Sequence, residues 1–289
     1  MINFLLLLLL VSLGSGGSIA IKIGLTSFSP ELFLLIRFTL ALLTLIPFLK
    51  KNAILTLIRI PTKVYLVSLL AVANVVLFAF GIRLTGVIIS SILYTLIPLI
   101  IGIFSHIFLH HRFRKNEIMG ALLGLIGALS IVLIPIFEGK SNINSGLIGN
   151  LLLLAAVTSF ALYTVLLAPF QKARSKTELN LAFFFITFVL LFISVLISWA
   201  TQQSLIISGP SIQSIFGLLF SGVLSTSFFY FLYQRLIQKG GPMYASLSFY
   251  LNPIAASIFG SIFLHERLTP FILLGASVTF LGVWIYGRK

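Results

Sequence analysis

The chain has 289 residues, of which 59% are hydrophobic and 8% are charged. Soluble domains carry about 25% charged residues, so this composition excludes an ordinary globular protein. The 19 Lys and Arg residues outnumber the 5 Asp and Glu residues, which gives a formal charge of +14, and Cys is absent. The basic residues are scattered between apolar runs and form no dense patch, so we expect no nucleic-acid partner. Without thiols, disulfide bonds and thiolate metal sites are excluded.

Apolar runs near the length that crosses a bilayer, about 20 residues, follow one another along the whole chain. They predict ten transmembrane helices, at residues 3–21, 31–49, 64–82, 86–109, 117–136, 147–169, 179–200, 212–234, 241–264 and 270–287. The first run has no basic residue before it and continues to Lys22, which favours a retained span over a signal peptide. The predicted fold class is therefore all-α, a polytopic membrane protein of ten transmembrane helices.

The positions of Lys and Arg indicate the orientation. A cytoplasmic N-terminus places 14 of them on the cytoplasmic side, namely Lys50, Lys51, Arg59, Lys63, Arg112, Arg114, Lys115, Lys172, Arg174, Lys176, Arg235, Lys239, Arg288 and Lys289. The other side receives four, namely Lys22, Arg83, Lys140 and Arg267. Because positive loops stay inside, we expect both termini in the cytoplasm and the protein in the inner or plasma membrane of the cell.

The two halves of the chain match each other at an offset of 155 residues. Gly86 pairs with Gly241, Pro98 pairs with Pro253, and residues 107–112 (IFLHHR) align with residues 262–267 (IFLHER). Each half contains five predicted spans, so the second half enters the membrane from the opposite side. Such inverted repeats are typical of alternating-access transporters. We expect a first repeat at residues 1–138, with helices one to five, and a second at residues 139–289, with helices six to ten.

Several motifs resemble those of the drug/metabolite transporter superfamily, in particular its ten-helix EamA type. They are the small-residue stretch 14–22 that ends in Lys22, Pro30, the Arg37-Phe38 pair, and a pattern of small residues, Pro and Phe-Leu-x-x-Arg at 91–112 and 246–267. The resemblance covers essentially the whole chain. It implies ten helices around a central cavity, with helices five and ten at the periphery. The first copy departs from the family pattern, because His111 stands where the second copy has Glu266.

Polar residues within the predicted spans are candidates for a substrate-binding cavity, because unpaired polar groups are costly in a bilayer. Tyr near small hydroxyl residues favours amphipathic or zwitterionic solutes. The predicted cavity residues are Ser15, Asn74, Ser91, Tyr94, Thr95, Thr158, Tyr163, Thr226, Tyr230, Tyr233, Ser246, Tyr250 and Asn252. Pro98 and Pro253 would each interrupt a helix and are predicted hinges. The alternative for any single Ser or Thr is a bond to a carbonyl one turn back.

Charged residues near the predicted outer side form a second candidate group. Its members are Lys22, Arg37, Glu266 and Arg267, which we expect to act in outer electrostatics or as a gate. We expect Lys22 or Arg37 to attract a substrate carboxylate near the outer vestibule. The alternatives are snorkelling for Lys22, and pairing with Glu31 or with helix-end carbonyls for Arg37. Glu266 is expected to belong to a charged cluster that closes the outer end of helix nine.

All five acidic residues lie at or near the ends of predicted spans, which argues against a proton relay through a buried carboxylate. His106 and His110 remain as titratable alternatives. No nucleophile and base pair, phosphate loop or dinucleotide fingerprint appears in the sequence. His106, His110 and His111 have an HxxxHH spacing, but four His residues without carboxylate partners are too few for a di-iron site. We therefore expect no enzyme activity, no metal and no cofactor.

These observations predict a secondary transporter of small metabolites that works by alternating access. The family resemblance implies export of amino acids or related neutral and zwitterionic compounds. Expected partners are a small-molecule metabolite and the lipid bilayer, and a monomer is compatible with the pattern. Two alternatives remain open from the sequence: a membrane receptor or scaffold that binds a hydrophobic ligand, and a carrier of nucleotide sugars or lipid-linked substrates.

Overall fold

The computed structural model describes residues 4–49, 53–109, 115–132, 143–250, 252–266 and 269–287. Helices form most of this part of the chain, and it contains no strand, only an isolated bridge between Phe28 and Ile206. The all-α fold class is confirmed for the described residues. The predicted cavity and gate positions lie within these ranges except Arg267, which falls outside them, and the side chain of Tyr250 is also outside the description.

The described helices follow the predicted apolar runs, except that α3 (Ala53–Arg59) lies in a predicted loop and the runs 86–109 and 241–264 are each divided between two helices. In the first half they are α1 (Phe4–Gly24), α2 (Pro30–Leu45) with a 3-10 turn (Ile46–Phe48), α3 (Ala53–Arg59), α4 (Thr62–Leu84), α5 (Val87–Tyr94), α6 (Ile97–Leu109) and α7 (Lys115–Val132). In the second half they are α9 (Ile143–Leu167) with a 3-10 turn (Ala168–Lys172), α10 (Lys176–Ala200), α11 (Ile212–Gly222), a π-helical segment (Val223–Phe228), α12 (Phe229–Ser246), a 3-10 turn (Leu247–Tyr250), α13 (Asn252–Leu264) and α14 (Pro270–Gly287).

Three helices begin at a serine whose hydroxyl accepts a backbone N–H of the first turn. Ser29 precedes α2 and accepts from Leu32, Ser175 precedes α10, and Ser211 precedes α11. A serine at this position satisfies one of the four free donors at a helix start. The sequence therefore sets these three starts locally.

Six helical segments are long and apolar enough to cross a membrane. They cover Pro30–Phe48, Thr62–Leu84, Val87–Phe108, Gly146–Lys172, Lys176–Ala200 and Ile212–Pro242. Four shorter apolar helices lie at Leu9–Gly24, Ile118–Gly127, Asn252–Leu264 and Pro270–Gly282. Large apolar side chains are exposed on the outer surface, among them Trp199, Phe216 and Trp284. A surface of this kind matches lipid and not water.

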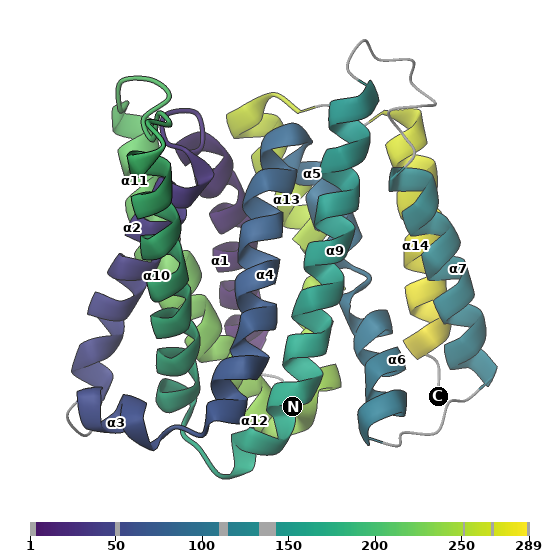
Figure 1. Cartoon of the computed structure of the whole chain (residues 1–289). Coiled ribbons are helices and arrows are strands. Elements are labelled where there is room, and N and C mark those ends of the chain that lie inside the picture. Colours follow the sequence, from purple (N-terminus) through teal and green to yellow (C-terminus); the bar gives the residue numbers. More distant parts are fainter. Residues whose placement is uncertain are drawn as a thin grey trace.

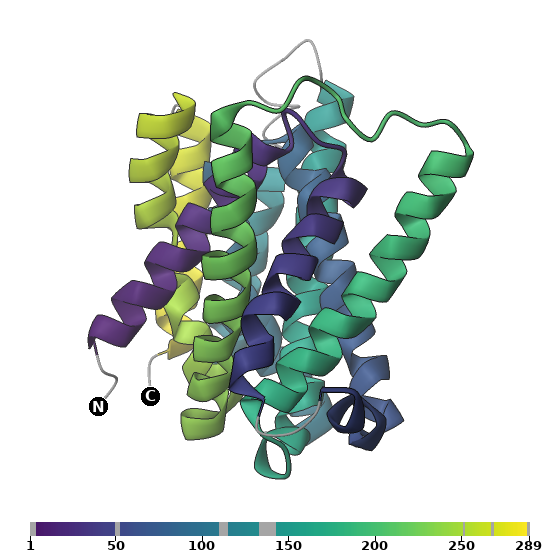
Figure 2. The same ribbon diagram turned by 90° about the vertical axis from the view of Figure 1, so that its left-hand side faces the viewer.

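The two ends of the helix bundle are distinguished by the chain termini. Figures 1 and 2 show that α1 begins and α14 ends at the same end of the bundle, at the bottom of both views. We call this the terminal end and the opposite one the far end. The chain passes from α4 to α5 at the far end, and α14 begins there (Figure 1).

Two helical paths are interrupted, and each interruption is followed by a predicted hinge proline. In the first half the chain leaves α5 after Tyr94, and Pro98 is the second residue of α6. In the second half α12 itself breaks at Gly241 (φ 81°), a 3-10 turn follows it, and Pro253 is the second residue of α13. Proline at the first turn loses no intrahelical hydrogen bond. Each proline therefore starts a new helix after a break, and does not kink a continuous one.

The helices α7 and α14 pack side by side at one edge of the bundle (Figure 1). Their contact depends on glycine, because a Cβ atom on Gly282 would lie 2.7 Å from the carbonyl oxygen of Gly120. Backbones can approach this closely only where side chains are absent. These helices correspond to the predicted spans five and ten.

Candidate functional site

A cavity of about 90 Å³ lies among the helices, roughly midway along them. This volume holds several water molecules. Its lining comes from both halves of the chain and consists of Gly14, Ser15, Gly17, Ser18, Ile21, Arg37, Asn74, Val75, Phe78, Ser90, Ser91, Tyr94, Phe160, Ser225, Phe229, Tyr230, Phe249 and Asn252. A cavity that presents polar groups between apolar helices is the type of site that membrane transport requires.

The paired helix breaks contribute directly to the cavity wall. Tyr94 ends α5, Asn252 begins α13, and both line the cavity. Phe249, in the turn before α13, also lines it, and the ring centroids of Tyr94 and Phe249 are 6.1 Å apart. Tyr94 and Phe249 are separated by 155 residues in the sequence and so occupy equivalent positions of the two halves. The repeat thus brings two equivalent interruptions to one site.

Hydrogen bonds at the cavity link elements from the two halves of the chain. Asn74 in α4 donates through Nδ2 to the hydroxyl of Tyr94 and to the carbonyl oxygen of Ala156, both at 2.8 Å. The hydroxyl of Ser15 donates to the carbonyl oxygen of Asn252 at 3.3 Å. These bonds join α4 to α9 and α1 to α13, so the cavity wall couples the two halves of the chain.

Arg37 is the one charged residue among the described cavity-lining residues. Only 6% of its surface is exposed, and its Nε donates to the hydroxyl of Thr226 at 2.6 Å. Its guanidinium carbon also lies 5.6 Å from the ring centroid of Phe38. The sequence placed Arg37 with Lys22 in an outer vestibule or against Glu31. The structure instead places it at the central cavity, because the face of α2 that carries Arg37 packs against the π-helical segment.

The π-helical segment positions Thr226. The hydroxyl of Thr226 donates to the carbonyl oxygen of Ser221 at 2.7 Å, five residues earlier, while it accepts from Arg37. Close packing surrounds this contact, since a Cβ atom on Gly222 would lie 3.1 Å from the carbonyl oxygen of Arg37. π-helical turns are rare and are frequent at functional sites. Nothing in the apolar pattern of residues 212–234 distinguished this turn from ordinary helix.

Six of the thirteen predicted cavity residues line the cavity: Ser15, Asn74, Ser91, Tyr94, Tyr230 and Asn252. Two of the others bond their own helix, Thr95 to the carbonyl oxygen of Ile92 and Thr158 to that of Leu154. Thr226 anchors Arg37, and Ser246 is fully buried. The rings of Tyr163 and Tyr233 contact the cavity-lining Phe160. Tyr163 also accepts from Gln234, and Tyr233 contacts Thr164. The side chain of Tyr250 lies outside the described part of the structure.

Aromatic residues form much of the cavity wall, and the phenylalanines among them are absent from the predicted cavity residues. Phe78, Phe160, Phe229 and Phe249 line the cavity together with Tyr94 and Tyr230. Phe160 contacts Phe249 at a centroid distance of 5.6 Å, and Phe183 contacts Tyr230 at 4.9 Å. The chain contains 28 Phe residues, so the residue type alone selects none of them. The repeat offset that relates Phe249 to Tyr94 would have identified one.

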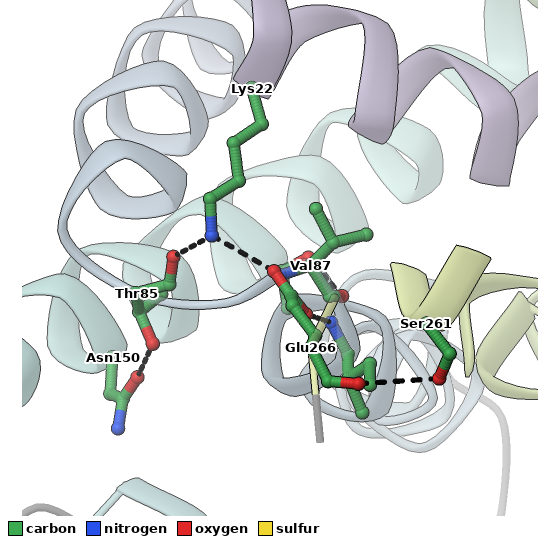
Figure 3. A network of polar contacts seen from close by, with 8 residues as sticks. Lys22, Thr85, Val87, Asn150, Ser261 and Glu266 are labelled. Atoms are coloured by element: carbon green, nitrogen blue, oxygen red, sulfur yellow. Dashed lines mark hydrogen bonds and ion pairs between the residues drawn. The ribbon is translucent and has the colours of Figure 1, made fainter. Parts of the chain in front are cut away.

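A polar network lies at the far end, where residues of both halves meet (Figure 3). Lys22 of α1 forms an ion pair with Glu266 at 2.9 Å and donates to the carbonyl oxygen of Thr85 at 2.7 Å. The two side chains of the pair are 27% and 15% exposed. The hydroxyl of Thr85 in turn donates to the side-chain oxygen of Asn150 in α9 at 2.8 Å.

Glu266 also caps the start of α5. Its two carboxylate oxygens accept the backbone N–H groups of Val87 and Ile88 at 2.8 and 2.9 Å (Figure 3). A carboxylate at a helix N-terminus is favoured by the free N–H groups and by the helix dipole. Gly86 leaves room for it, because a Cβ atom there would lie 3.1 Å from one of the oxygens. The charged residue that follows α13 is thus bound to α1 and α5, and the predicted contribution of Arg267 lies outside the described residues.

Apolar helices of membrane-spanning length around a cavity with polar and aromatic groups define a polytopic membrane protein. The EamA-like transporter family model matches residues 1–133 and 147–288. The chain belongs to this family, and the protein is accordingly a transporter, as the sequence motifs indicated.

Individual relatives agree with this assignment. The chain is 26% identical over 278 residues to the uncharacterized transporter YoaV of Bacillus subtilis, covering 92% of this chain and 90% of that protein. It is 23% identical to an uncharacterized transporter of Archaeoglobus fulgidus, over 70% of this chain and 68% of that one. A WAT1-related protein of Arabidopsis thaliana is 24% identical over 62% of this chain and 50% of that one.

A solved crystal structure resembles the fold over nearly its whole length. The TM-score is 0.68 at 16% sequence identity, and the match covers 98% of this chain and 95% of the other. At this identity the likeness concerns the fold alone.

Proposed function

We propose that this transporter moves small metabolites by alternating access around the central cavity. The observation that carries the proposal is that both halves of the chain line one cavity at equivalent helix breaks. In transporters built from inverted repeats, substrates bind near the bilayer midplane at such discontinuous helices. Pro98 and Pro253 would act as hinges beside this site.

The proposal includes ten transmembrane helices in two inverted repeats, at residues 1–138 and 139–289. Six long and four shorter apolar helices occupy the ten predicted runs, and the family model matches the chain twice, at 1–133 and 147–288. Both observations support this arrangement. We further propose that a monomer suffices, because the residues of one chain line the cavity.

The Lys22–Glu266 pair is the proposed outer gate. It joins α1 to the connection that follows α13 and to the start of α5, so the far end cannot open without separating these contacts. The equivalent position in the first half holds His111, which lies outside the described residues and is no carboxylate. With both termini in the cytoplasm and the protein in the cell membrane, the gate faces outward.

Amino acids or related neutral and zwitterionic compounds are the proposed substrates, and export is the proposed direction. Amide and hydroxyl groups together with aromatic faces at the cavity suit such solutes. A nucleotide sugar fits less well, because the described lining offers a single cation for two phosphate groups.

The proposal is tested with purified protein in liposomes. We expect saturable flux of labelled amino acids, and we expect Tyr94→Ala to reduce it more than the exposed control Leu122→Ala on α7.

A second experiment places one Cys at Ser91 in the cysteine-free chain and labels it with an impermeant thiol reagent from each side. Labelling from both sides supports alternating access, whereas labelling from one side only, without flux, would indicate a receptor or scaffold.

A further inference from the structure

Arg37 carries a positive charge into the central cavity without a described acidic partner. Its Nε is bound to Thr226, and no described residue accepts a hydrogen bond from its two terminal amino groups. The described lining of the cavity contains no Asp or Glu. Elsewhere in the described chain, Glu266 is bound to Lys22, and Glu178 lies 3.7 Å from Arg174.

A buried cation without a counter-charge is unfavourable, more so in a membrane protein than in a soluble one. The side chain of Arg37 is nevertheless fixed here. The hydroxyl of Thr226 donates to the carbonyl oxygen of Ser221 and accepts a hydrogen bond from the Nε of Arg37. This anchoring holds the planar guanidinium at one edge. The opposite edge carries the two terminal amino groups, whose parallel N–H bonds can bind both oxygens of a carboxylate.

Other features of the cavity favour an anion with an apolar body. The helix α13 begins at the cavity wall with Asn252, so the positive end of its dipole lies beside the site. The aromatic rings of Phe78, Phe160 and Phe249 provide an apolar surface on the same cavity. A phosphate monoester carries up to two negative charges and would need more than the single cation present.

We propose that Arg37 is the carboxylate-binding residue of the central cavity, and that the substrates are small carboxylates with an apolar or aromatic body. The proposal rests on the proposed function, because it assumes that this cavity is the substrate site. It places the recognition of the carboxylate at the centre of the molecule and not in the outer vestibule. Thr226 acts as a positioning residue for the guanidinium.

The test measures binding and not flux, so that it is independent of transport. The full-length protein is purified into nanodiscs, and the affinities for two matched pairs are determined by calorimetry or thermal shift: benzoate with benzamide, and phenylalanine with phenylalaninamide. The variants are Arg37→Gln and Arg37→Lys. The control is Arg235→Gln, which removes an exposed cation from α12.

We expect at least one carboxylate to bind the wild-type protein and Arg235→Gln equally well, and to bind Arg37→Gln about tenfold to a hundredfold more weakly, as the loss of charged hydrogen bonds implies. Both amides lack the carboxylate and should bind more weakly than their acids in the wild-type protein. Benzamide, which is uncharged, should not respond to the substitution. Arg37→Lys should retain part of the affinity. If Arg37→Gln does not fold, the Arg37→Lys variant and the comparison of acid with amide on the wild-type protein still test the proposal.

Equal affinity for acid and amide would overturn the proposal, as would unchanged carboxylate binding by a folded Arg37→Gln protein. Tighter binding of phenyl phosphate than of benzoate would also overturn it, as would the absence of any carboxylate binding at millimolar concentrations. Failure of the proposed function gives a different result: carboxylates then bind through Arg37, but the liposomes show no flux.

Discussion

Glu266 makes three contacts, which join it to two distant parts of the chain. It pairs with Lys22, 244 residues away, and accepts two backbone N–H groups of α5. Each contact uses the negative charge, so a neutral amide of the same shape would weaken all of them. This residue is therefore the point at which the far end is most sensitive to a single change.

We expect Glu266→Gln to open the far end more often. The rate at which an impermeant thiol reagent labels Ser91→Cys from the outer side should rise about tenfold, because one charged hydrogen bond contributes about 1.5–3 kcal/mol. The matched control is Glu178→Gln, which breaks the surface contact with Arg174 and should leave the rate unchanged. If Glu266→Gln leaves the labelling rate unchanged, the Lys22–Glu266 pair is not a gate.

Asn180 shows the opposite situation, a polar side chain without partners. It is fully buried in α10, and neither its amide nitrogen nor its amide oxygen has a hydrogen bond in the structure. Asn74 is also buried, but it makes two hydrogen bonds. The desolvation of an unpaired amide is unfavourable by about 1–3 kcal/mol.

Replacing each of these residues by Leu should therefore have effects of opposite sign. Asn180→Leu should stabilise the protein by about 1–3 kcal/mol and raise Tm, whereas Asn74→Leu should destabilise it by a similar amount. Thermal unfolding of the two purified variants beside the wild-type protein measures both. A lower Tm for Asn180→Leu would show that this amide has a partner after all.

At the scale of elements, the π-helical segment decides where Arg37 lies. The turn widens the helix between α11 and α12, and Thr226 fills the wider turn by donating to Ser221. The same hydroxyl accepts from Arg37 of α2. One side chain thus satisfies a backbone carbonyl and orients a charge on a neighbouring helix.

Thr226→Val should destabilise the protein by about 1–3 kcal/mol, because it leaves the carbonyl oxygen of Ser221 and the Nε of Arg37 without their partner. Thr226→Ser keeps the hydroxyl and should remain close to the wild-type Tm. Thr201→Val is the control, because its hydroxyl bonds the exposed end of α10, where the expected change is within about 0.5 kcal/mol. Equal effects of Val and Ser at position 226 would contradict the role of the hydroxyl.

At the scale of the whole molecule, the two ends of the helix bundle allow a prediction of which end faces the cytoplasm. The terminal end contains the start of α1 and the end of α14 (Figures 1 and 2). The basic residues Lys172 and Arg174 follow α9, whereas the loop between α10 and α11, residues 201–211, is uncharged. This asymmetry favours a cytoplasmic terminal end.

Reporter fusions measure this topology. Green fluorescent protein after Lys289 should fluoresce, and alkaline phosphatase should be active when fused after Ser208, because it folds only outside the cytoplasm. Phosphatase fused after Arg174 should be inactive and is the matched control. Activity at Arg174 with none at Ser208 would reverse the orientation, and with it the assignment of Lys22 and Glu266 to the outer side.

Much of the architecture could be predicted from the sequence, because a helix in lipid satisfies its own backbone hydrogen bonds. The apolar runs therefore located the helices, and Pro98 and Pro253 located the two breaks. The site was predicted only in part. Thr95 and Tyr94 are adjacent polar residues of one helix, yet one bonds its own backbone and the other lines the cavity. Composition and spacing do not distinguish these two outcomes.

The sequence by itself determined the helical class, the family and the positions of the helix breaks, because these depend on local composition and on short-range backbone chemistry. Only the tertiary structure decided that Arg37 belongs to the cavity and that Lys22 binds Glu266. Those contacts join residues 189 and 244 positions apart, and a charge deep in a membrane protein is stable only where a distant part of the chain supplies its partner.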